Sequence, residues 1–242
     1  MEFSKRANID RMITVHHLET SRSQRILWLL EELGLPYELK VYARDPLTRL
    51  APPALKKIHP LGKSPVITDG DLVVAESGAI IEYLVETYGP VSAPDLQHLN
   101  PERGSPAHFQ NRFWMHYAEG SLMNWLVMKL VFGAIPSRPM PFFVKPIARA
   151  ICNSVQTQLI DPNLKTALTF IEAHLSHNTW FTGEHLAMAD FQMSFAVEAA
   201  LLRGGDVSAY PHVQAYKERI NARPAYQRAI AQGGPVLMKP AA

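Results

Sequence analysis

The sequence has very little cysteine: Cys152 is the only one among 242 residues. One cysteine cannot form a disulfide within the chain, which excludes a disulfide-stapled scaffold and is compatible with a reducing compartment. Cys152 lies inside a helical pattern, where a buried packing role is more frequent than a reactive thiol. We therefore expect it to pack rather than react.

Long apolar runs and a strong net charge are also lacking. No apolar run approaches the roughly 18 residues that a membrane helix needs. Residues 1–10 are charged and have no apolar core of a secretory signal. Lys and Arg number 24 and Asp and Glu number 22, a net charge of +2 that leaves no basic footprint for nucleic acid. We expect a cytoplasmic protein without a nucleic-acid or membrane partner.

Several catalytic and metal-binding motifs are missing. There is no Gly-x-Ser-x-Gly nucleophile elbow and no glycine-rich phosphate loop. His16 and His17 are neighbours in a strand pattern, so their side chains face opposite sides and cannot share one ion. His174 and His177 have helical spacing but no clear third ligand. We expect no metal site; a Ser/His/Asp triad stays open, although nothing points to one.

Periodicity divides the first 90 residues into short alternating elements. Apolar residues alternate at strand period and then recur at helix period, and Asp69-Gly70 between two apolar runs is a strong hairpin signal. This order predicts a compact α/β layer with a mixed four-stranded sheet. The expected elements are a strand near 13–18, a helix at 22–33, a strand at 37–41, a loop with one irregular helical turn at 43–61, strands at 66–68 and 72–74, and a helix from Ser77 that Gly89-Pro90 ends.

The rest of the chain lacks strand patterns. Proline, serine and asparagine predict a linker at 91–105. Helical patterns then cover 106–132, 142–175, 187–202 and 211–231, with Asp161-Pro162 as a stop or a kink. We predict an α/β domain at 12–90 and an all-helical domain at 106–242. Residues 1–11 are either a loose extension or a cloning remnant.

Ser21 lies where the first strand meets the first helix. Ser21-x-x-Gln24 matches a capping box, so the simplest role for Ser21 is the helix N-cap. The same position lies at the positive end of the helix dipole, which favours a bound anion. A hydroxyl there can donate a hydrogen bond to a thiolate and raise the ionised fraction of a thiol whose free pKa is about 8.5.

Two further segments offer binding groups for a small peptide. Pro65 begins a strand; if its peptide bond is cis, the backbone N–H and C=O of Ser64 are open to an extended ligand. Ser77 can be a plain N-cap, or its hydroxyl can bind a carboxylate while Glu76 binds an ammonium group. Lys63 can hold a second carboxylate.

These residues together resemble the glutathione S-transferase superfamily, closest to its bacterial and fungal serine-type enzymes. The likeness covers nearly the whole chain from Met12, and the order and spacing of its parts are specific. The parts are Ser21 to Arg25, Pro60 to Val66, Glu76 to Ile80, Gly183 to Asp190 and Ala222 to Tyr226.

The resemblance implies a thioredoxin-like domain followed by a helical domain, usually as a homodimer. It implies that Ser21 donates to the sulfur of glutathione, with Ser23, Thr20 or a backbone amide as alternatives. The other glutathione contacts that it implies are Ser64 before a cis Pro65 for the cysteinyl backbone, Glu76 and Ser77 for the γ-glutamyl group, and Lys63 for the glycyl end.

The implied activity is conjugation of reduced glutathione, as co-substrate, to a hydrophobic electrophile, as in detoxification. Met115 and Tyr117 are candidate walls of the electrophile site, although either can simply pack. A glutathione-dependent peroxidase, isomerase or dehalogenase is the alternative among enzymes. A non-catalytic carrier of glutathione or apolar ligands is the alternative of another class.

One position departs from the family pattern. Ala187 stands where a Ser or Thr N-cap is usual before Met188-Ala189-Asp190. Loss of such a cap costs about 1 kcal/mol. We expect lower local stability at this helix start and no change in chemistry.

Overall fold

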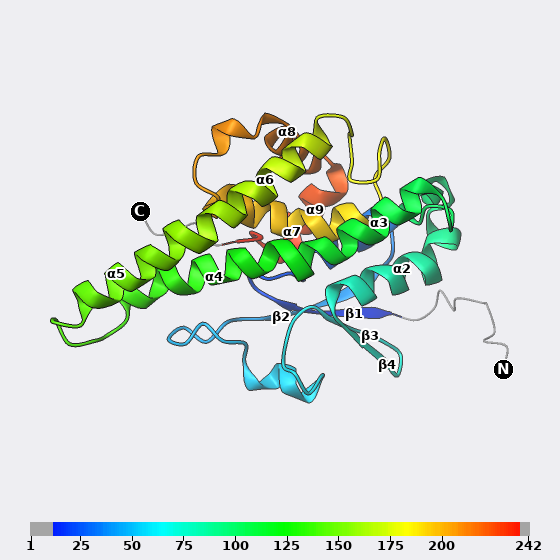
Figure 1. Cartoon of the computed structure of the whole chain (residues 1–242). Coiled ribbons are helices and arrows are strands. Elements are labelled where there is room, and N and C mark those ends of the chain that lie inside the picture. Colours follow the sequence, from blue (N-terminus) through cyan, green and yellow to red (C-terminus); the bar gives the residue numbers. More distant parts are fainter. Residues whose placement is uncertain (1–11, 238–242) are drawn as a thin grey trace.

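A computed structural model describes residues 12–237 (Figure 1). The predicted extension, residues 1–11, and residues 238–242 lie outside the described part. An α/β domain comes first and a helical domain follows it, which confirms the predicted fold class. Within the described residues, no helix is long and apolar enough to cross a membrane.

The sheet has the strand order β2–β1–β3–β4 and mixes both pairing directions. β1 is parallel to β2, with Val15 opposite Leu39, and antiparallel to β3, with Val15 opposite Ile67. β3 and β4 form the predicted hairpin, and Gly70 in its turn has φ 57°. The strands are β1 (Ile13–Leu18), β2 (Tyr37–Tyr42), β3 (Val66–Asp69) and β4 (Leu72–Ala75).

Two α-helices cover the side of the sheet that faces the helical domain (Figure 1). They are α1 (Gln24–Leu33) and α2 (Ser77–Ser92). The predicted irregular turn is the 3-10 segment η1 (Pro53–Lys57), on the opposite side of the sheet. Gly34 ends α1 in the left-handed conformation, with φ 63°.

The expected stop of α2 at Gly89-Pro90 is wrong, because α2 continues to Ser92. A proline removes one backbone donor, and near the end of a helix the later N–H groups can still pair: Ala93 donates to the Gly89 carbonyl. The predicted linker then contains a 3-10 segment, η2 (Pro94–Leu99).

The helical domain has more breaks than the periodicity predicted. The pattern at 211–231 is two helices, because Pro224 begins a new one at its first position. The α-helices are α3 (Pro106–Tyr117), α4 (Met123–Ala134), α5 (Lys145–Val155), α6 (Asp161–Leu175), α7 (Met188–Arg203), α8 (Pro211–Asn221) and α9 (Pro224–Gly233). Two 3-10 segments, η4 (Ile135–Ser137) and η6 (Val207–Ala209), lie in connections.

Two π-helical turns interrupt the longest helical patterns. They are η3 (Ala118–Leu122), between α3 and α4, and η5 (Gln156–Ile160), between α5 and α6. Pro162 follows η5 in the first turn of α6, so the chain passes Asp161-Pro162 without leaving the helix. Single π-turns inside helices are frequent at functional sites.

α1 lies at the centre of the core and joins the two domains. It packs against α2 of its own domain and against α7 and α9 of the helical domain. Trp28 of α1 is fully buried, with its ring 4.4 Å from that of Phe191 and 5.5 Å from that of Tyr226. The end of α9 reaches β1, where the Gly233 carbonyl oxygen lies 2.9 Å from Nε2 of His17.

The start of α7 is capped from another helix. Asn111 of α3 accepts a hydrogen bond from the Ala189 N–H at 2.9 Å. Asp190 accepts from the N–H groups of Ala187 and Phe181, at 2.8 and 3.0 Å. Asn111 thus satisfies the donor that a Ser or Thr at position 187 would satisfy, which offsets the loss expected there.

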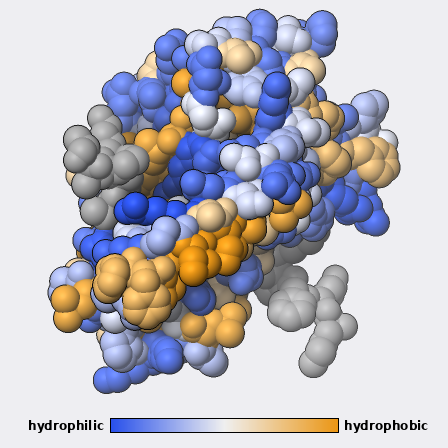
Figure 2. Space-filling view, turned by 60° about the vertical axis from the view of Figure 1, so that its left-hand side comes forward, coloured by the Kyte–Doolittle hydropathy of each residue, from blue (hydrophilic) through white to orange (hydrophobic). Residues whose placement is uncertain are grey.

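Apolar side chains remain exposed along the α4–α5 hairpin. The strip that faces the viewer in Figure 2 gathers over this end of the molecule. The large apolar residues that are exposed on α4, on α5 and in their connection are Val127, Leu130, Val131, Phe142, Phe143, Ile147 and Ile151. Cys152 of α5 is buried and free, in keeping with the predicted packing role.

Candidate active site

Ser21 lies in a turn before α1 and does not cap it. α1 begins at Gln24 with Ser23 at the N-cap position, and the Gln24 amide donates to the Ala229 carbonyl of α9 at 2.8 Å. The predicted capping box is therefore wrong. Gln24, its second residue, instead bonds to Ala229 of α9, which lies more than 200 positions later in the sequence.

The Ser21 hydroxyl is the outer end of a buried chain of polar groups. Its Oγ lies 2.7 Å from the Oγ of Ser23, which lies 2.8 Å from Nδ1 of His17. Nε2 of His17 lies 2.9 Å from the carbonyl oxygen of Gly233, at the end of α9. Ser23 is 0% exposed and Ser21 is 5% exposed, so Ser21 is the more accessible of the two hydroxyls.

Ser64 is held against the end of β1. Its hydroxyl donates to the His16 carbonyl at 3.0 Å and accepts from the Leu18 N–H at 3.2 Å. The Ser64–Pro65 peptide bond is cis, as the resemblance implied. These bonds bring Ser64 to the strand end that leads into Ser21. Lys63 is exposed beside it.

Ser77 is the first residue of α2, not its N-cap as predicted. The N-cap position is Glu76, which has φ 71° and ψ 123°. A non-glycine residue in this conformation costs about 1–3 kcal/mol, and such strain gathers at ligand sites. Glu76 is exposed, whereas Ser77 is buried.

A buried arginine links Ser77 to the helical domain. Nη1 of Arg25 donates to Ser77 Oγ at 3.0 Å, to Glu119 Oε1 at 2.9 Å and to Gln192 Oε1 at 2.8 Å. Nε of Arg22 donates to both carboxylate oxygens of Glu119 at 2.9 Å. Glu119 lies in the π-turn η3, so that irregular turn aims a carboxylate at the site.

Charge and burial act against each other in this cluster. Burial lowers the pKa of Arg25 to about 10, although Glu119 works in the opposite direction. Burial also pushes the pKa of Glu119 upward, but the charges and hydrogen bonds of Arg25 and Arg22 outweigh it and lower that pKa. The pair therefore stays ionised at neutral pH, and Ser77 accepts a hydrogen bond from a cation.

No role was predicted for Arg25, Glu119 or Gln192 from the sequence. One signal was present for Arg25: it lies four residues before Leu29, on the apolar side of α1, where a charge needs a buried partner. No comparable signal marked Glu119 or Gln192, which belong to distant helices.

Comparison with known proteins places this geometry in a family. The N-terminal domain of glutathione S-transferases matches residues 21–87, and the C-terminal domain matches residues 156–224. Glutathione S-transferase 3 of Schizosaccharomyces pombe is 36% identical over 88% of this chain and 85% of its own length. The chain belongs to the glutathione S-transferase superfamily.

Two further similarities agree with this membership. Glutathione S-transferase 1 of Saccharomyces cerevisiae is 31% identical over 89% of this chain and 92% of its own length. The crystal structure of a glutathione S-transferase from Actinobacillus pleuropneumoniae has a TM-score of 0.74 and 33% identity, and the match covers 92% of this chain and 93% of that one.

The two residues expected at the electrophile site of this glutathione S-transferase have different surroundings. Met115 is 6% exposed, and its Cε lies 3.8 Å from the point where a Cβ on Gly78 would be. Tyr117 stacks on Phe113 and borders a cavity of about 480 Å³ that Phe113, His116 and Gly120 also line. Met115 therefore packs beneath the start of α2, and Tyr117 faces a surface hollow.

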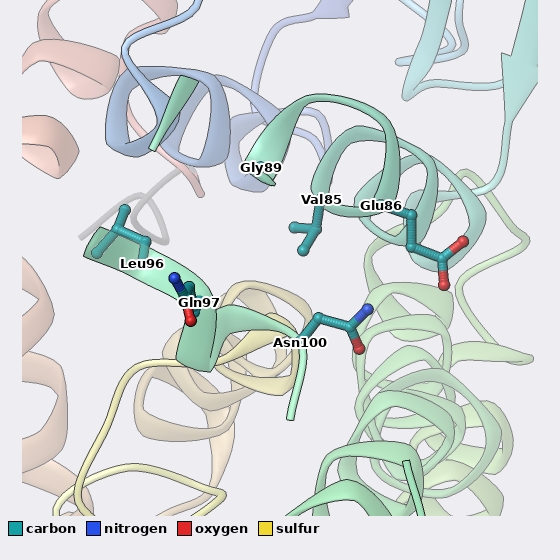
Figure 3. Close-up of a pocket in the computed structure, with 6 residues that line it drawn as sticks. All are labelled: Val85, Glu86, Gly89, Leu96, Gln97 and Asn100. Carbon is teal, nitrogen blue, oxygen red and sulfur yellow. The ribbon is translucent and has the colours of Figure 1, made fainter. Parts of the chain in front are cut away.

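A second cavity, of about 370 Å³, lies between α2 and η2 (Figure 3). Val85, Glu86 and Gly89 line it from α2, and the other lining residues come from η2 and the residue after it. No site residue predicted from the sequence borders this cavity. Among the described residues, no group of three or more His, Cys, Asp or Glu side chains is placed to hold a metal ion.

Proposed function

We propose that this glutathione S-transferase conjugates reduced glutathione to hydrophobic electrophiles, with Ser21 as the donor to the sulfur. One observation carries the proposal: Ser64, beside a cis proline, is bonded to the end of β1 that leads into Ser21, and Ser77 at the start of α2 is bonded to Arg25 of α1. They offer a thiolate donor, a backbone edge and a carboxylate partner around one place, as a γ-glutamyl peptide requires.

The expected chemistry follows from the free energy of one hydrogen bond. A free thiol has a pKa of about 8.5 and is mostly protonated at neutral pH. A hydrogen bond to a charged group contributes about 1.5–3 kcal/mol, and one pKa unit corresponds to about 1.4 kcal/mol. A donor that binds only the thiolate therefore lowers the pKa of the thiol by one to two units. The ionised sulfur then attacks an electrophilic carbon.

The remaining contacts follow the charges of glutathione. Ser64 pairs through its backbone with the cysteinyl unit, and Lys63 attracts the glycyl carboxylate. Ser77 donates to the γ-glutamyl carboxylate, because its oxygen already accepts from Arg25 and its own hydrogen remains for a ligand. Glu76 takes the ammonium group of the same residue.

We further propose a homodimer in the cytoplasm that acts in detoxification. The resemblance supports the dimer, and a single cysteine suits a reducing compartment. Met115 and Tyr117 stay candidates for the electrophile site, and Tyr117 is the better placed because it borders a cavity.

The decisive experiment combines binding with turnover. We expect the protein to bind a glutathione-affinity column and to conjugate a model aryl halide. Ser21→Ala should lower kcat/KM at least tenfold, about 1.4 kcal/mol or more, because the thiolate loses its donor. Thermal unfolding of the variant should be measured alongside, since Ser21 also accepts the Ser23 N–H.

Three results separate the possibilities. Failure to bind glutathione would overturn the proposed function. Binding without conjugation would identify a carrier. Normal kinetics of Ser21→Ala would move the donor role to Ser23, Thr20 or a backbone amide.

A further inference from the structure

Behind Ser21, three more groups form a buried line of hydrogen bonds that ends on the opposite domain. The line runs from Ser21 to Ser23, to His17 and to the Gly233 carbonyl, with heavy-atom distances of 2.7, 2.8 and 2.9 Å. Each distance suits a strong hydrogen bond. The Gly233 carbonyl at the end of the line determines the direction of donation in each of the other hydrogen bonds.

A carbonyl oxygen can only accept, so the Gly233 contact requires a proton on Nε2 of His17. A neutral imidazole has one N–H, so Nδ1 is an acceptor. The Ser23 hydroxyl donates to Nδ1 at 2.8 Å in preference to the Leu18 carbonyl, which lies 3.4 Å away. Ser23 Oγ is then free to accept the hydrogen of the Ser21 hydroxyl. In this first state the hydrogen of Ser21 points inward, away from a ligand.

The same heavy atoms permit a second state. If His17 gains a proton on Nδ1, that nitrogen donates to Ser23 Oγ, and the Ser23 hydroxyl turns to donate to Ser21 Oγ. The Ser21 hydrogen then points outward, where a thiolate can accept it. Nε2 still donates to Gly233, so every donor and acceptor in the line has a partner in both states.

We propose that Ser23 and His17 are positioning residues that carry the thiol proton of bound glutathione inward from Ser21 to Nδ1 of His17. The S–H bond breaks and its proton bonds to Ser21 Oγ. The former Ser21 hydrogen passes to Ser23 Oγ, and the former Ser23 hydrogen passes to Nδ1. The products are a thiolate outside and an imidazolium inside, with no other reactant. This inference rests on the proposed donor role of Ser21.

The surroundings of His17 suit an acceptor that waits in the neutral form. Burial lowers its pKa, while the Gly233 carbonyl and the Glu19 carboxylate act in the opposite direction. Glu19 is the charged neighbour, just beyond the end of β1. Among the described residues, the hydrogen-bond partners of His17 from other elements are uncharged: Ser23 before α1 and the Gly233 carbonyl of α9. Its register partner in β2, Val41, is also uncharged. A thiolate outside would add the negative charge that favours the imidazolium.

Nitrogen NMR of the His17 ring in the unaltered protein tests the inference directly. We expect a neutral Nε2–H imidazole in the free protein and an imidazolium once glutathione binds as thiolate. S-methylglutathione, which has no thiol proton, should leave His17 neutral. An imidazolium in that second complex would overturn the inference, as would a neutral His17 beside a thiolate detected by ultraviolet absorbance.

Variants give an independent test through the pH profile of kcat/KM. Ser23→Ala and His17→Asn should each lower kcat/KM about tenfold at neutral pH, which corresponds to an apparent thiol pKa about one unit higher. The KM for glutathione should stay near its original value. Both variants should approach the original rate above the pKa of a free thiol, where no acceptor is needed, and a merely structural defect would persist there.

Matched controls and outcomes complete the design. Ser194→Ala removes another buried serine hydroxyl, and His174→Asn removes another histidine whose Nε2 lies by a carbonyl, that of Phe181. Neither should shift the pH profile. If Ser21→Ala shifts the profile and the inner variants do not, the relay is wrong while the proposed function stands. If glutathione does not bind, the proposed function itself fails.

Discussion

Two serines of the site differ in what already occupies their oxygen atoms. Ser21 meets another hydroxyl, whereas Ser77 accepts from the buried guanidinium of Arg25. A hydroxyl oxygen that accepts from a cation is polarised, so its own hydrogen is a stronger donor. This difference supports the proposal that Ser77 binds the γ-glutamyl carboxylate and Ser21 stabilises the thiolate.

Ser77→Ala should raise the KM for glutathione about tenfold and change kcat less than about threefold. The reason is that a ground-state contact, worth about 1.4 kcal/mol, is removed far from the sulfur. Steady-state kinetics with glutathione as the varied substrate measure both values. Ser92→Ala, at the other end of α2, removes a hydroxyl bonded to the Tyr88 carbonyl and serves as the control. An unchanged KM would refute the carboxylate role.

At this scale the sequence predicts candidate groups, and the structure adds their hydrogen-bond partners. Ser21, Ser64 and Ser77 were identified from spacing and resemblance. The contacts of Arg25 and His17 were missed because their partners Glu119 and Gly233 lie 94 and 216 positions away in the chain. Local patterns carry no information on contacts of that separation.

At the scale of single elements, helix starts show how tertiary contacts replace local capping. The predicted Ser21 and Ser77 caps are wrong, and the missing cap at Ala187 is supplied by Asn111 from α3. Each helix end requires partners for its free N–H groups, but nothing requires those partners to be near in sequence. Capping rules therefore show that a helix start needs acceptors for its free N–H groups, but they do not show which residue supplies them.

Asn111→Ala should lower the free energy of unfolding by about 1–2 kcal/mol, because the buried N–H of Ala189 loses its acceptor. Urea unfolding followed by circular dichroism measures the change. Asn124→Ala, which removes an exposed amide bonded to the Gly120 carbonyl, should cost less than about 0.5 kcal/mol.

A second substitution sharpens this test. Ala187→Ser in the Asn111→Ala background restores an N-cap hydroxyl and should recover about half or more of the lost stability. If Asn111→Ala causes no loss of unfolding free energy and Ala187→Ser adds none, the contact between α3 and α7 does not stabilise this helix start.

At the scale of the whole molecule, Glu119 is one of the charges that join the two domains, beside the pairs of Glu31 and Glu32 of α1 with Arg228 and Arg223. It binds Arg22 and Arg25 of the α/β domain from the helical domain, and the Arg25 side chain is 0% exposed. Glu119→Gln leaves a buried cation without its counter-charge, so we expect a loss of about 3 kcal/mol in unfolding free energy. Glu38→Gln, in an exposed pair with Lys40, should cost less than about 1 kcal/mol.

The pH dependence of that loss has a definite sign. The pKa of Glu119 is lowered in the folded protein, so its carboxylate stabilises the fold above the ordinary value of 4.5. As pH falls below 4.5 and through the lowered pKa, the stabilisation disappears. Chemical unfolding at several pH values should show the original protein and Glu119→Gln converging in acid. A constant difference would contradict the ion pair as its source.

We expect a dimer in solution, with a molar mass by light scattering of twice the 27.1 kDa chain mass. The exposed apolar strip on α4 and α5 adds a check on where copies meet. If Leu130→Asp yields monomers, the strip is part of the interface; if the dimer persists, the copies meet elsewhere. A monomer for the unaltered chain would contradict the proposed dimer.

The sequence by itself determined the elements and their order, because strand alternation, helical stripes and the Asp69-Gly70 turn act between near neighbours. It also determined the family, because several short motifs keep their spacing over the whole chain. The tertiary structure alone decided which groups lie behind the Ser21 hydroxyl, what caps α7 and which cation meets Ser77. Those outcomes depend on the packing of α3, α7 and α9 around α1. Packing between segments that are distant in the chain leaves no pattern among neighbouring residues of the sequence.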